Sequence, residues 1–217
     1  MNKKYILKNS NLKILKNKIK KSDKVLLFLD YDGSLAPFNK DPMQAFIVPK
    51  SRKNLKKLRA DGSYHLNLVS GRKLSELKKI FPFADINYAG SHGLEVELSF
   101  TEGVIYPYQD NKIDKLSREN YIKIKEKYQS SKKVEVEDKG FGLALHLDSQ
   151  QKADEIKAEI KPLVKNSAYE LLAGRKIIEI RPQGWDKGKA VNYITKKLKQ
   201  KFEIKDPLRI YIGDDST

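Results

Sequence analysis

The chain has 217 residues, enough for a main domain and a smaller inserted one. It contains no cysteine, which excludes disulfides and thiolate chemistry and suits a cytoplasmic location, and no apolar run nears the roughly 18 residues that span a bilayer. The net charge of +16 comes mostly from lysines spread along predicted helices, so we expect a solvated basic surface that favours an anionic substrate, with no nucleic-acid or membrane partner.

The first part of the chain alternates between strand and helix patterns. A helical pattern over residues 3–21 predicts a helix that packs on the first strand. Five consecutive apolar residues, Val25 to Leu29, predict a strand buried on both faces. A helix that opens at Pro49 leads to a second strand at 65–69, and a helix through Leu74, Leu77 and Ile80 leads to a third strand at 86–89. This β-α-β-α-β order predicts an α/β fold with a Rossmann-like doubly wound parallel sheet.

The pattern changes at Leu94 and returns to strand and helix alternation after residue 182. Between these points we expect antiparallel hairpins and two helices, which read as an inserted α/β domain over residues 94–182. The core domain then comprises residues 1–93 and 183–217, with a late helix over 186–199 and a strand over 208–212.

Two carboxylates follow the first strand directly. Asp30 and Asp32 are two residues apart, so an extended chain can aim both toward the same side at the sheet edge where α/β proteins bind ligands. One carboxylate there can attack phosphorus while the other handles a proton, and both suit Mg²⁺. The alternative interpretation is a simple turn, because Asp32-Gly33 is a common turn dipeptide.

Three later segments place suitable groups at equivalent positions. Ser70-Gly71 closes the second strand and can hold a phosphoryl oxygen with a hydroxyl and an amide. Lys187 opens the late helix and offers an ammonium group to an anion. Asp214 and Asp215 end the last strand and offer hard oxygen ligands for Mg²⁺. The sequence therefore predicts that these charged groups converge at one edge of the sheet.

These segments resemble the four ordered motifs of the haloacid-dehalogenase-like (HAD-like) phosphatases. The residues in and around these motifs resemble one branch, the trehalose-phosphate phosphatases, from about Lys24 to the last residue. The segments that carry this likeness are Leu29-Asp30-Tyr31-Asp32-Gly33-Ser34-Leu35-Ala36-Pro37, Ser70-Gly71-Arg72, Gly90-Ser91-His92-Gly93-Leu94-Glu95, Gly174-Arg175-Lys176-Ile177-Ile178-Glu179-Ile180-Arg181-Pro182, Gly184-Trp185-Asp186-Lys187-Gly188-Lys189-Ala190 and Gly213-Asp214-Asp215-Ser216-Thr217.

The resemblance implies a Mg²⁺-dependent phosphoric monoester hydrolase that releases phosphate from trehalose 6-phosphate in trehalose biosynthesis. Asp30 would be the nucleophile that forms an aspartyl-phosphate, and Asp32 would act as general acid and base. Ser70 and Lys187 would stabilise the transferring phosphoryl group. The metal would be held by Asp30, the Asp32 carbonyl and Asp214, with Asp215 in support. A trehalose-phosphate synthase is an expected partner.

The insertion matches the family's cap domain, which closes over the sugar. We expect substrate contacts from its last hairpin and from the segments that follow the second and third core strands, at Arg72, His92, Glu95, Lys176, Glu179 and Arg181. Lys176 and Glu179 are three residues apart, so both reach one ligand only with a bulge or at the strand's end. An ordinary charged hairpin and a structural His92 are the alternative interpretations.

Other functions stay open on the sequence. Phosphatases for sucrose phosphate or a glycosyl-phosphoglycerate share the four motifs, and a catalytically impaired sugar-phosphate-binding fragment is an alternative of another class. The chain ends at Thr217, whereas family members continue through a further helix and strand. We therefore expect a truncated chain with weak or no activity, and greater stability and turnover in an extended form.

Overall fold

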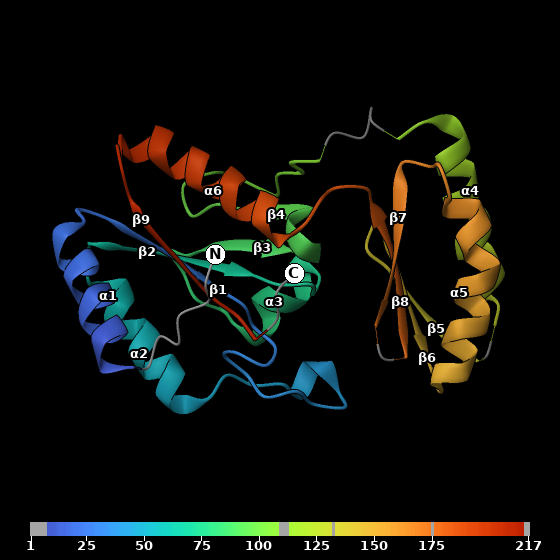
Figure 1. The fold of residues 1–217 in the computed structure, drawn as a ribbon, viewed down its shortest axis with the longest axis horizontal. Coiled ribbons are helices and arrows are strands. Elements are labelled where there is room, and N and C mark those ends of the chain that lie inside the picture. The colour runs from blue at the N-terminus through green and yellow to red at the C-terminus, as the bar shows by residue number, and fades with distance from the viewer. Residues whose placement is uncertain (1–7, 109–112, 132, 175, 215–217) are drawn as a thin grey trace. The chain divides into compact units, whose positions relative to one another are not determined.

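A computed structural model describes residues 8–108, 113–131, 133–174 and 176–214. The chain divides into two compact units. Unit 1 comprises Met1–Pro107 and Asp186–Thr217, and unit 2 comprises Tyr108–Trp185. Figure 1 shows their elements in chain order. Among the residues described, no helix is long and apolar enough to cross a membrane.

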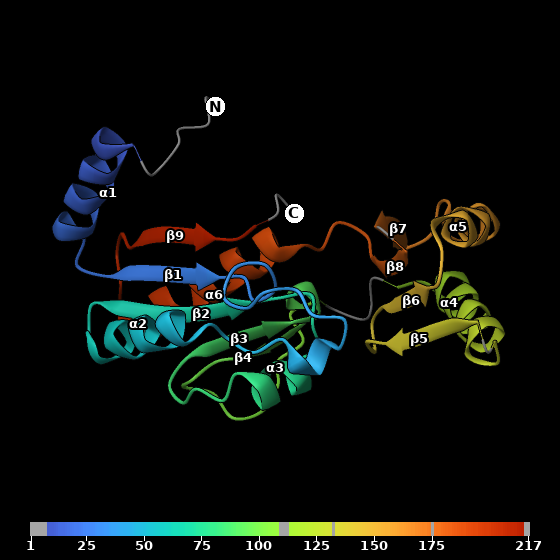
Figure 2. The ribbon, with the colours of Figure 1, turned by 90° about the horizontal axis from the view of Figure 1, so that it is seen from below.

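Unit 1 is built on a five-stranded sheet with the order β4-β3-β2-β1-β9. Neighbouring strands are parallel except β3 and β4, which are antiparallel (Figure 2). The parallel strands place their carboxyl ends at one edge, where α/β folds bind ligands. The strands are β1 (Val25–Leu29), β2 (Tyr64–Val69), β3 (Asn87–Gly90), β4 (Glu95–Glu97) and β9 (Leu208–Ile212).

The central strand β1 is apolar throughout because both of its faces are covered. Leu27 and Leu29 point into a core with the helices α2 (Pro49–Ala60) and α3 (Leu74–Ile80). Leu26 and Phe28, both fully buried, point into a second core with α6 (Lys187–Phe202). Helices therefore cover both faces of a mostly parallel sheet, which confirms the predicted doubly wound α/β fold.

Two sequence expectations for unit 1 differ from the structure. The helix α1 (Asn9–Lys21) has no buried residue, so the predicted packing on the first strand is not seen among the residues described. Residues 94–107, expected in the insertion, belong to unit 1. The reason is that β4 pairs with β3 and carries Val96 into the α6-side core, where it is fully buried.

Unit 2 is a four-stranded antiparallel sheet with the order β5-β6-β8-β7 and two helices. The helices contact each other and the sheet, so they share one face (Figure 1). Alternate strand residues such as Leu145, Ile178 and Ile180 are buried beneath these helices. The elements are α4 (Lys115–Gln129), β5 (Val134–Asp138), β6 (Leu143–Leu147), α5 (Gln150–Val164), β7 (Tyr169–Gly174) and β8 (Ile177–Pro182).

Candidate active site

Asp30 and Lys187 form a buried ion pair at the carboxyl end of β1. Lys187 Nζ lies 2.6 Å from Asp30 Oδ2, and both side chains are 5% exposed. The other carboxylate oxygen, Asp30 Oδ1, accepts a hydrogen bond of 2.8 Å from the Tyr31 amide. Such a carboxylate is held in one orientation by two donors, and the adjacent ammonium group offers a positive charge to an incoming anion.

Local structure explains why Lys187 reaches this position. It is the first residue of α6, and the preceding residue Asp186 caps that helix by accepting a 2.8 Å hydrogen bond from the Lys189 amide. The helix is anchored to the sheet through Ala190 and Ile194, both fully buried. The cap and the core together therefore aim an ammonium group at a carboxylate 157 positions away in sequence.

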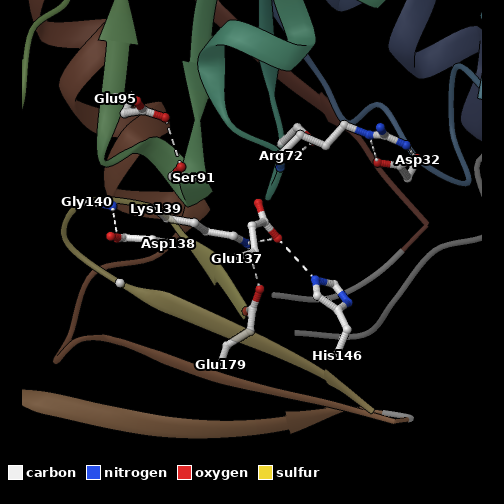
Figure 3. A network of polar contacts seen from close by, with 12 residues as sticks. Asp32, Arg72, Ser91, Glu95, Glu137, Asp138, Lys139, Gly140, His146 and Glu179 are labelled. Atoms are coloured by element: carbon white, nitrogen blue, oxygen red, sulfur yellow. Dashed lines mark hydrogen bonds and ion pairs between the residues drawn. The ribbon is translucent and has the colours of Figure 1, made fainter. Parts of the chain in front are cut away.

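Asp32 and Arg72 form a second ion pair, with two parallel hydrogen bonds. Arg72 Nε and Nη2 donate to Asp32 Oδ2 and Oδ1 at 2.7 and 2.6 Å (Figure 3). Arg72 Nη1 also donates to the Pro42 carbonyl at 2.6 Å. This bidentate geometry orients Asp32 rigidly. Arg72 was expected to contact substrate, but in this conformation its guanidinium group contacts Asp32 and the loop that follows β1.

Ser70 directly follows β2 and is hydrogen-bonded to the tight loop that follows β3. Its side chain is buried, its hydroxyl accepts from the Arg72 amide at 3.2 Å, and its carbonyl accepts from the His92 amide at 2.9 Å. Ser91 and His92 adopt left-handed φ values of 50° and 58°, which are strained for residues other than glycine. The His92 ring lies so close to Gly71 that a Cβ there would come within 2.8 Å of Nε2. Ser70, Gly71 and His92 are thus brought together.

Glu95 makes contacts that differ from its expected role. Its Oε2 atom accepts a hydrogen bond of 3.0 Å from the amide of Leu74, the first residue of α3. It also accepts one of 2.9 Å from the Ser91 hydroxyl (Figure 3). A carboxylate in this place satisfies an amide that the helix leaves unpaired and complements the helix dipole. The contacts therefore support a structural role for Glu95, where sequence reasoning placed it in the sugar pocket.

The last described acidic residue, Asp214, lies against the turn after β1. A Cβ at Gly33 would lie 2.2 Å from Asp214 Oδ2, so only glycine leaves room for this carboxylate. The backbones of β1 and β9 are hydrogen-bonded here, since the Asp30 amide donates to the Ile212 carbonyl at 2.9 Å. Asp215, also predicted as a ligand, lies outside the residues described.

The donor set at this edge suits Mg²⁺. The side chains of Asp30 and Asp214 and the carbonyl of Asp32 are all hard oxygen donors. No three acidic or histidine side chains gather as a metal site within the described ranges. A set with two carboxylates still fits, because Mg²⁺ usually keeps several waters and uses only one or two carboxylates.

The three candidates in unit 2 lie on or beside β8. Lys176 is exposed in the turn before the strand, with a φ of 60°. Glu179 and Arg181 share the strand face that points away from the helices, because Ile178 and Ile180 are buried on the other. Glu179 accepts from Lys139 at 3.0 Å and Arg181 donates to Glu170 at 2.7 Å. Lys176 is thus at the strand's end, one of the two arrangements, with a bulge, that would let it and Glu179 reach one ligand.

Sequence reasoning missed the partners of Glu179 on this face. Lys139, Glu137 and His146 form polar contacts with one another or with Glu179 (Figure 3). The one available signal was the alternation of charged and apolar residues in 134–138, which places Glu135 and Glu137 on the face away from the core. Residue spacing does not predict which side chains on such a face contact one another.

Comparisons with known proteins agree with these motifs. The sequence model of the family described as Trehalose-phosphatase matches residues 28–217. The chain is 33% identical over 208 residues to Probable trehalose-phosphate phosphatase J of Arabidopsis thaliana, covering 89% of this chain and 55% of that protein. It is 31% identical over 213 residues to Trehalose-phosphate phosphatase B of the same plant, covering 91% and 55%. The chain thus spans about half the length of these curated relatives.

Solved structures show the same fold. The C-terminal domain of the C. albicans trehalose-6-phosphate phosphatase superposes with a TM-score of 0.74 at 23% identity, covering 94% of this chain and 73% of that one. A trehalose-6-phosphate phosphatase related protein superposes with a TM-score of 0.63 at 21% identity, covering 88% of each. At these identities the likeness carries the HAD-like fold alone, while the family match rests on sequence over most of the chain. The chain belongs to the trehalose-phosphatase family.

Proposed function

We propose that this chain is a Mg²⁺-dependent phosphatase that hydrolyses trehalose 6-phosphate to trehalose and phosphate through an aspartyl-phosphate. The observation that carries the proposal is the buried Asp30–Lys187 pair at the carboxyl edge of the parallel sheet, at 2.6 Å. A phosphatase of this type needs an oriented carboxylate next to a fixed positive charge, and this pair supplies both. The identity of the proposed substrate, trehalose 6-phosphate, is taken from the names of the curated relatives.

In the first half-reaction, Asp30 attacks the phosphorus atom. A bond forms between a carboxylate oxygen and phosphorus while the bond between phosphorus and the sugar oxygen breaks. Asp32 gives a proton to the departing oxygen, which leaves as the hydroxyl of trehalose. In the second half-reaction a water attacks the phosphorus, Asp32 takes a proton from it, and the bond to Asp30 breaks to release phosphate.

Lys187, Ser70 and the metal act on the charge of the phosphoryl group. The Lys187 ammonium is held at the nucleophile and stabilises negative charge on the transferring oxygens. The Ser70 hydroxyl donates a hydrogen bond to the same group. Asp30, the Asp32 carbonyl and Asp214 would hold Mg²⁺, which when bound offsets the repulsion between two anions and orients them.

Arg72 occupies part of the hydrogen-bonding capacity of Asp32. Each Asp32 oxygen accepts one hydrogen bond from Arg72, so a contact with the leaving sugar oxygen uses a remaining lone pair or displaces one of these bonds. We propose that substrate entry moves the Arg72 guanidinium aside by breaking at least one of these bonds. The contact between Arg72 and the Pro42 carbonyl links this exchange to the loop after β1.

We propose that unit 2 serves as the cap domain, with Lys176, Glu179 and Arg181 directed to the sugar. The exposed face of its sheet carries charged side chains, which is the kind of surface that hydrogen-bonds sugar hydroxyls. A cytoplasmic location and a trehalose-phosphate synthase partner remain predictions. The synthase is the class of enzyme whose product, a phosphorylated disaccharide, this reaction would consume.

Phosphate release from trehalose 6-phosphate, with and without Mg²⁺, tests the proposal. Sucrose, glucose and glycerate phosphates are assayed beside it. We expect metal-dependent release that is strongest with trehalose 6-phosphate, and its loss in Asp30→Asn. Asp23→Asn, an exposed carboxylate at the surface, is the matched control and should keep wild-type rates. Circular dichroism confirms that both variants fold. Equal release in Asp30→Asn would exclude the covalent carboxylate, and preference for another sugar phosphate would exclude the proposed substrate.

A further inference from the structure

Tyr31 lies in sequence between Asp30 and Asp32, the proposed nucleophile and the proposed acid–base group. Its amide donates to Asp30 Oδ1 at 2.8 Å, so its backbone holds the nucleophile. Its side chain is fully buried and belongs to the core on the side of α2 and α3. The contacts that this side chain makes lead back to Asp32 by way of Arg72.

The guanidinium group of Arg72 lies over the aromatic ring of Tyr31. Its central carbon is 5.5 Å from the ring centre, which is within the range of about 6 Å where a ring face attracts a cation. The same guanidinium group makes the two parallel hydrogen bonds to Asp32 (Figure 3). The Phe81 ring meets the Tyr31 ring edge to face, with the centres 5.9 Å apart, and so limits its tilt. The Tyr31 ring thus restricts the positions open to the guanidinium group.

A short helical turn in the loop after β1 connects the Tyr31 hydroxyl to Arg72. The turn, η1 (Pro42–Gln44), is followed by Ala45, whose amide donates to the Pro42 carbonyl at 3.3 Å. The Tyr31 hydroxyl donates to the Ala45 carbonyl at 2.7 Å. Arg72 Nη1 donates to the Pro42 carbonyl at 2.6 Å. The phenol, the turn and the guanidinium group therefore form a closed set of contacts, which we call the contact circuit.

Burial makes the inner part of the contact circuit rigid. Tyr31 and Ala45 are at most 1% exposed, and the Arg72 side chain is 10% exposed. Breaking a buried hydrogen bond leaves its donor or acceptor without a replacement from water, so the phenol and the turn keep one arrangement. The Asp32 side chain, in contrast, is 26% exposed. A rigid and buried support therefore holds a carboxylate that stays accessible to substrate.

We propose that Tyr31 is a positioning residue for proton transfer: its side chain orients Arg72, and Arg72 orients Asp32. The phenol hydroxyl holds the turn that binds Arg72, and the aromatic face holds the guanidinium group itself. When substrate entry breaks a bond between Arg72 and Asp32, these two contacts remain to keep the guanidinium group close. The proposal rests on the proposed function, because it assigns Tyr31 to the acid–base role of Asp32.

Two substitutions separate the hydroxyl from the ring, because Tyr31→Phe removes only the hydroxyl and Tyr31→Leu also removes the aromatic face. We expect kcat for trehalose 6-phosphate to fall about 3- to 10-fold in Tyr31→Phe and about 10- to 100-fold in Tyr31→Leu, with KM changed by less than about twofold. Tyr31→Leu combined with Arg72→Lys should lose about as much as Arg72→Lys alone, because both side chains act through Asp32. Wild-type kcat in both single variants overturns the proposal.

Tyr88→Phe is the matched control for the loss of a buried hydroxyl. Tyr88 belongs to the same core as Tyr31, and its hydroxyl also donates to a backbone carbonyl, that of Phe81, at 2.7 Å. The contacts of the described residues do not tie it to Arg72, so its kcat should stay within about twofold of wild type. An equal fall in kcat in Tyr88→Phe and Tyr31→Phe would show that core packing in general sets the rate, which overturns the proposal.

The first half-reaction distinguishes a misplaced acid from a chain that is partly unfolded. A sugar oxygen needs a proton from Asp32 as it leaves, whereas p-nitrophenolate leaves without one. In single-turnover experiments Tyr31→Leu should slow the release of trehalose, while p-nitrophenol release from p-nitrophenyl phosphate keeps its wild-type rate. An equal loss on both substrates overturns the proposal. Circular dichroism checks folding, and if Tyr31→Leu does not fold, Tyr31→Phe carries the same comparison with its smaller expected loss.

NMR of the Arg72 side chain tests its position without any substrate. Arg72 Nε donates to Asp32 Oδ2 at 2.7 Å, so we expect slow exchange of this proton with water, in a signal assigned by its absence in Arg72→Lys. The exchange should accelerate about tenfold or more in Tyr31→Leu, less in Tyr31→Phe, and stay slow in Tyr88→Phe. If the wild-type chain turns over no sugar phosphate, the proposed function fails but this measurement still decides whether Tyr31 holds Arg72. Unchanged exchange in both Tyr31 variants overturns the proposal.

Discussion

Arg72 uses three nitrogen atoms to tie the proposed acid–base Asp32 to the loop after β1. Lysine has the same charge but lacks the planar fork, so it cannot make the two parallel bonds. We predict that Arg72→Lys lowers kcat for the sugar phosphate by about 10- to 100-fold, because a misplaced catalytic group costs rate on that order. Steady-state phosphate release measures this.

The control for this prediction is Arg52→Lys. Arg52 stacks over the Phe83 ring, with its guanidinium carbon 5.4 Å from the ring centre, and the observed contacts do not tie it to Asp32. It should keep the wild-type kcat. An unchanged kcat in Arg72→Lys would show that the orientation of Asp32 does not depend on the bidentate pair.

Tyr88 is a buried phenol that makes stability depend on alkaline pH. Its hydroxyl lies 2.7 Å from the Phe81 carbonyl and accepts from the Phe83 amide at 3.0 Å. Burial disfavours the charged form and raises its pKa from 10.0 to about 12. Below pH 10 the group is neutral in both folded and unfolded chains, so its contribution is complete there. Above that pH the unfolded chain ionises first, and stability falls until the folded pKa is passed.

We predict that wild type loses about 3 kcal/mol in total through Tyr88 as the pH rises from below 10 to above 12, at about 1.4 kcal/mol per pKa unit. Tyr88→Phe should be less stable at neutral pH by about 1–3 kcal/mol, because Phe83 loses a hydrogen-bond partner. Its stability should then fall less steeply above pH 10. Urea unfolding at several pH values measures both curves, and parallel curves would contradict the assignment.

The helix α6 carries the proposed charge-stabilising lysine as its first residue, so the helix start matters for function. The Asp186 side chain accepts from the Lys189 amide, which is a standard way to satisfy a free amide at a helix start. We predict that Asp186→Ala lowers the free energy of unfolding by about 1 kcal/mol and also lowers kcat, because Lys187 loses its fixed starting point.

The conservative variant Asp186→Asn keeps an oxygen acceptor and should restore most of the stability. Urea unfolding and phosphate release on the same preparations compare the two variants. If Asp186→Ala loses stability but keeps the wild-type kcat, the buried contact with Asp30 alone positions Lys187.

Each unit has its own apolar core, which suggests that the units open separately. The clusters around β1 consist of residues of unit 1, whereas Ile160 of α5 is fully buried among the residues of unit 2. We predict that Ile160→Ala destabilises unit 2 by about 2–5 kcal/mol through the cavity it leaves. Amide hydrogen exchange should accelerate in β6 and β8 and stay slow in β1.

Ile194→Ala is the matched variant in unit 1, because Ile194 of α6 is equally buried, in the core between that helix and the sheet. It should accelerate exchange in β1 and leave β6 and β8 protected. Uniform acceleration through both units in either variant would show instead that the chain unfolds as a single cooperative body.

Much of unit 1 could be predicted from sequence because its signals are local. The apolar run Val25–Leu29 marks a strand covered on both faces, and the helix that opens at Pro49 and the one through Leu74, Leu77 and Ile80 follow from their spacing. The assignment of residues 94–107 could not be predicted, because a short hairpin pattern looks the same whether it joins a core sheet or an insertion. The helix α1 forms as predicted, but its packing could not be predicted for a related reason, since a loose amphipathic pattern does not say what covers it; Leu12, Leu15 and Ile19 are half-buried.

The positions of the carboxylates and the lysine at the sheet edge followed from residue order alone, because parallel strands end on the same side. The hydrogen-bonding partner of each charged group could not be predicted from residue order. That Lys187 contacts Asp30, that Arg72 holds Asp32, and that Glu95 caps α3 depend on contacts between residues far apart in the chain. Such contacts depend on how helices and strands pack in three dimensions, and local spacing carries no information about that packing.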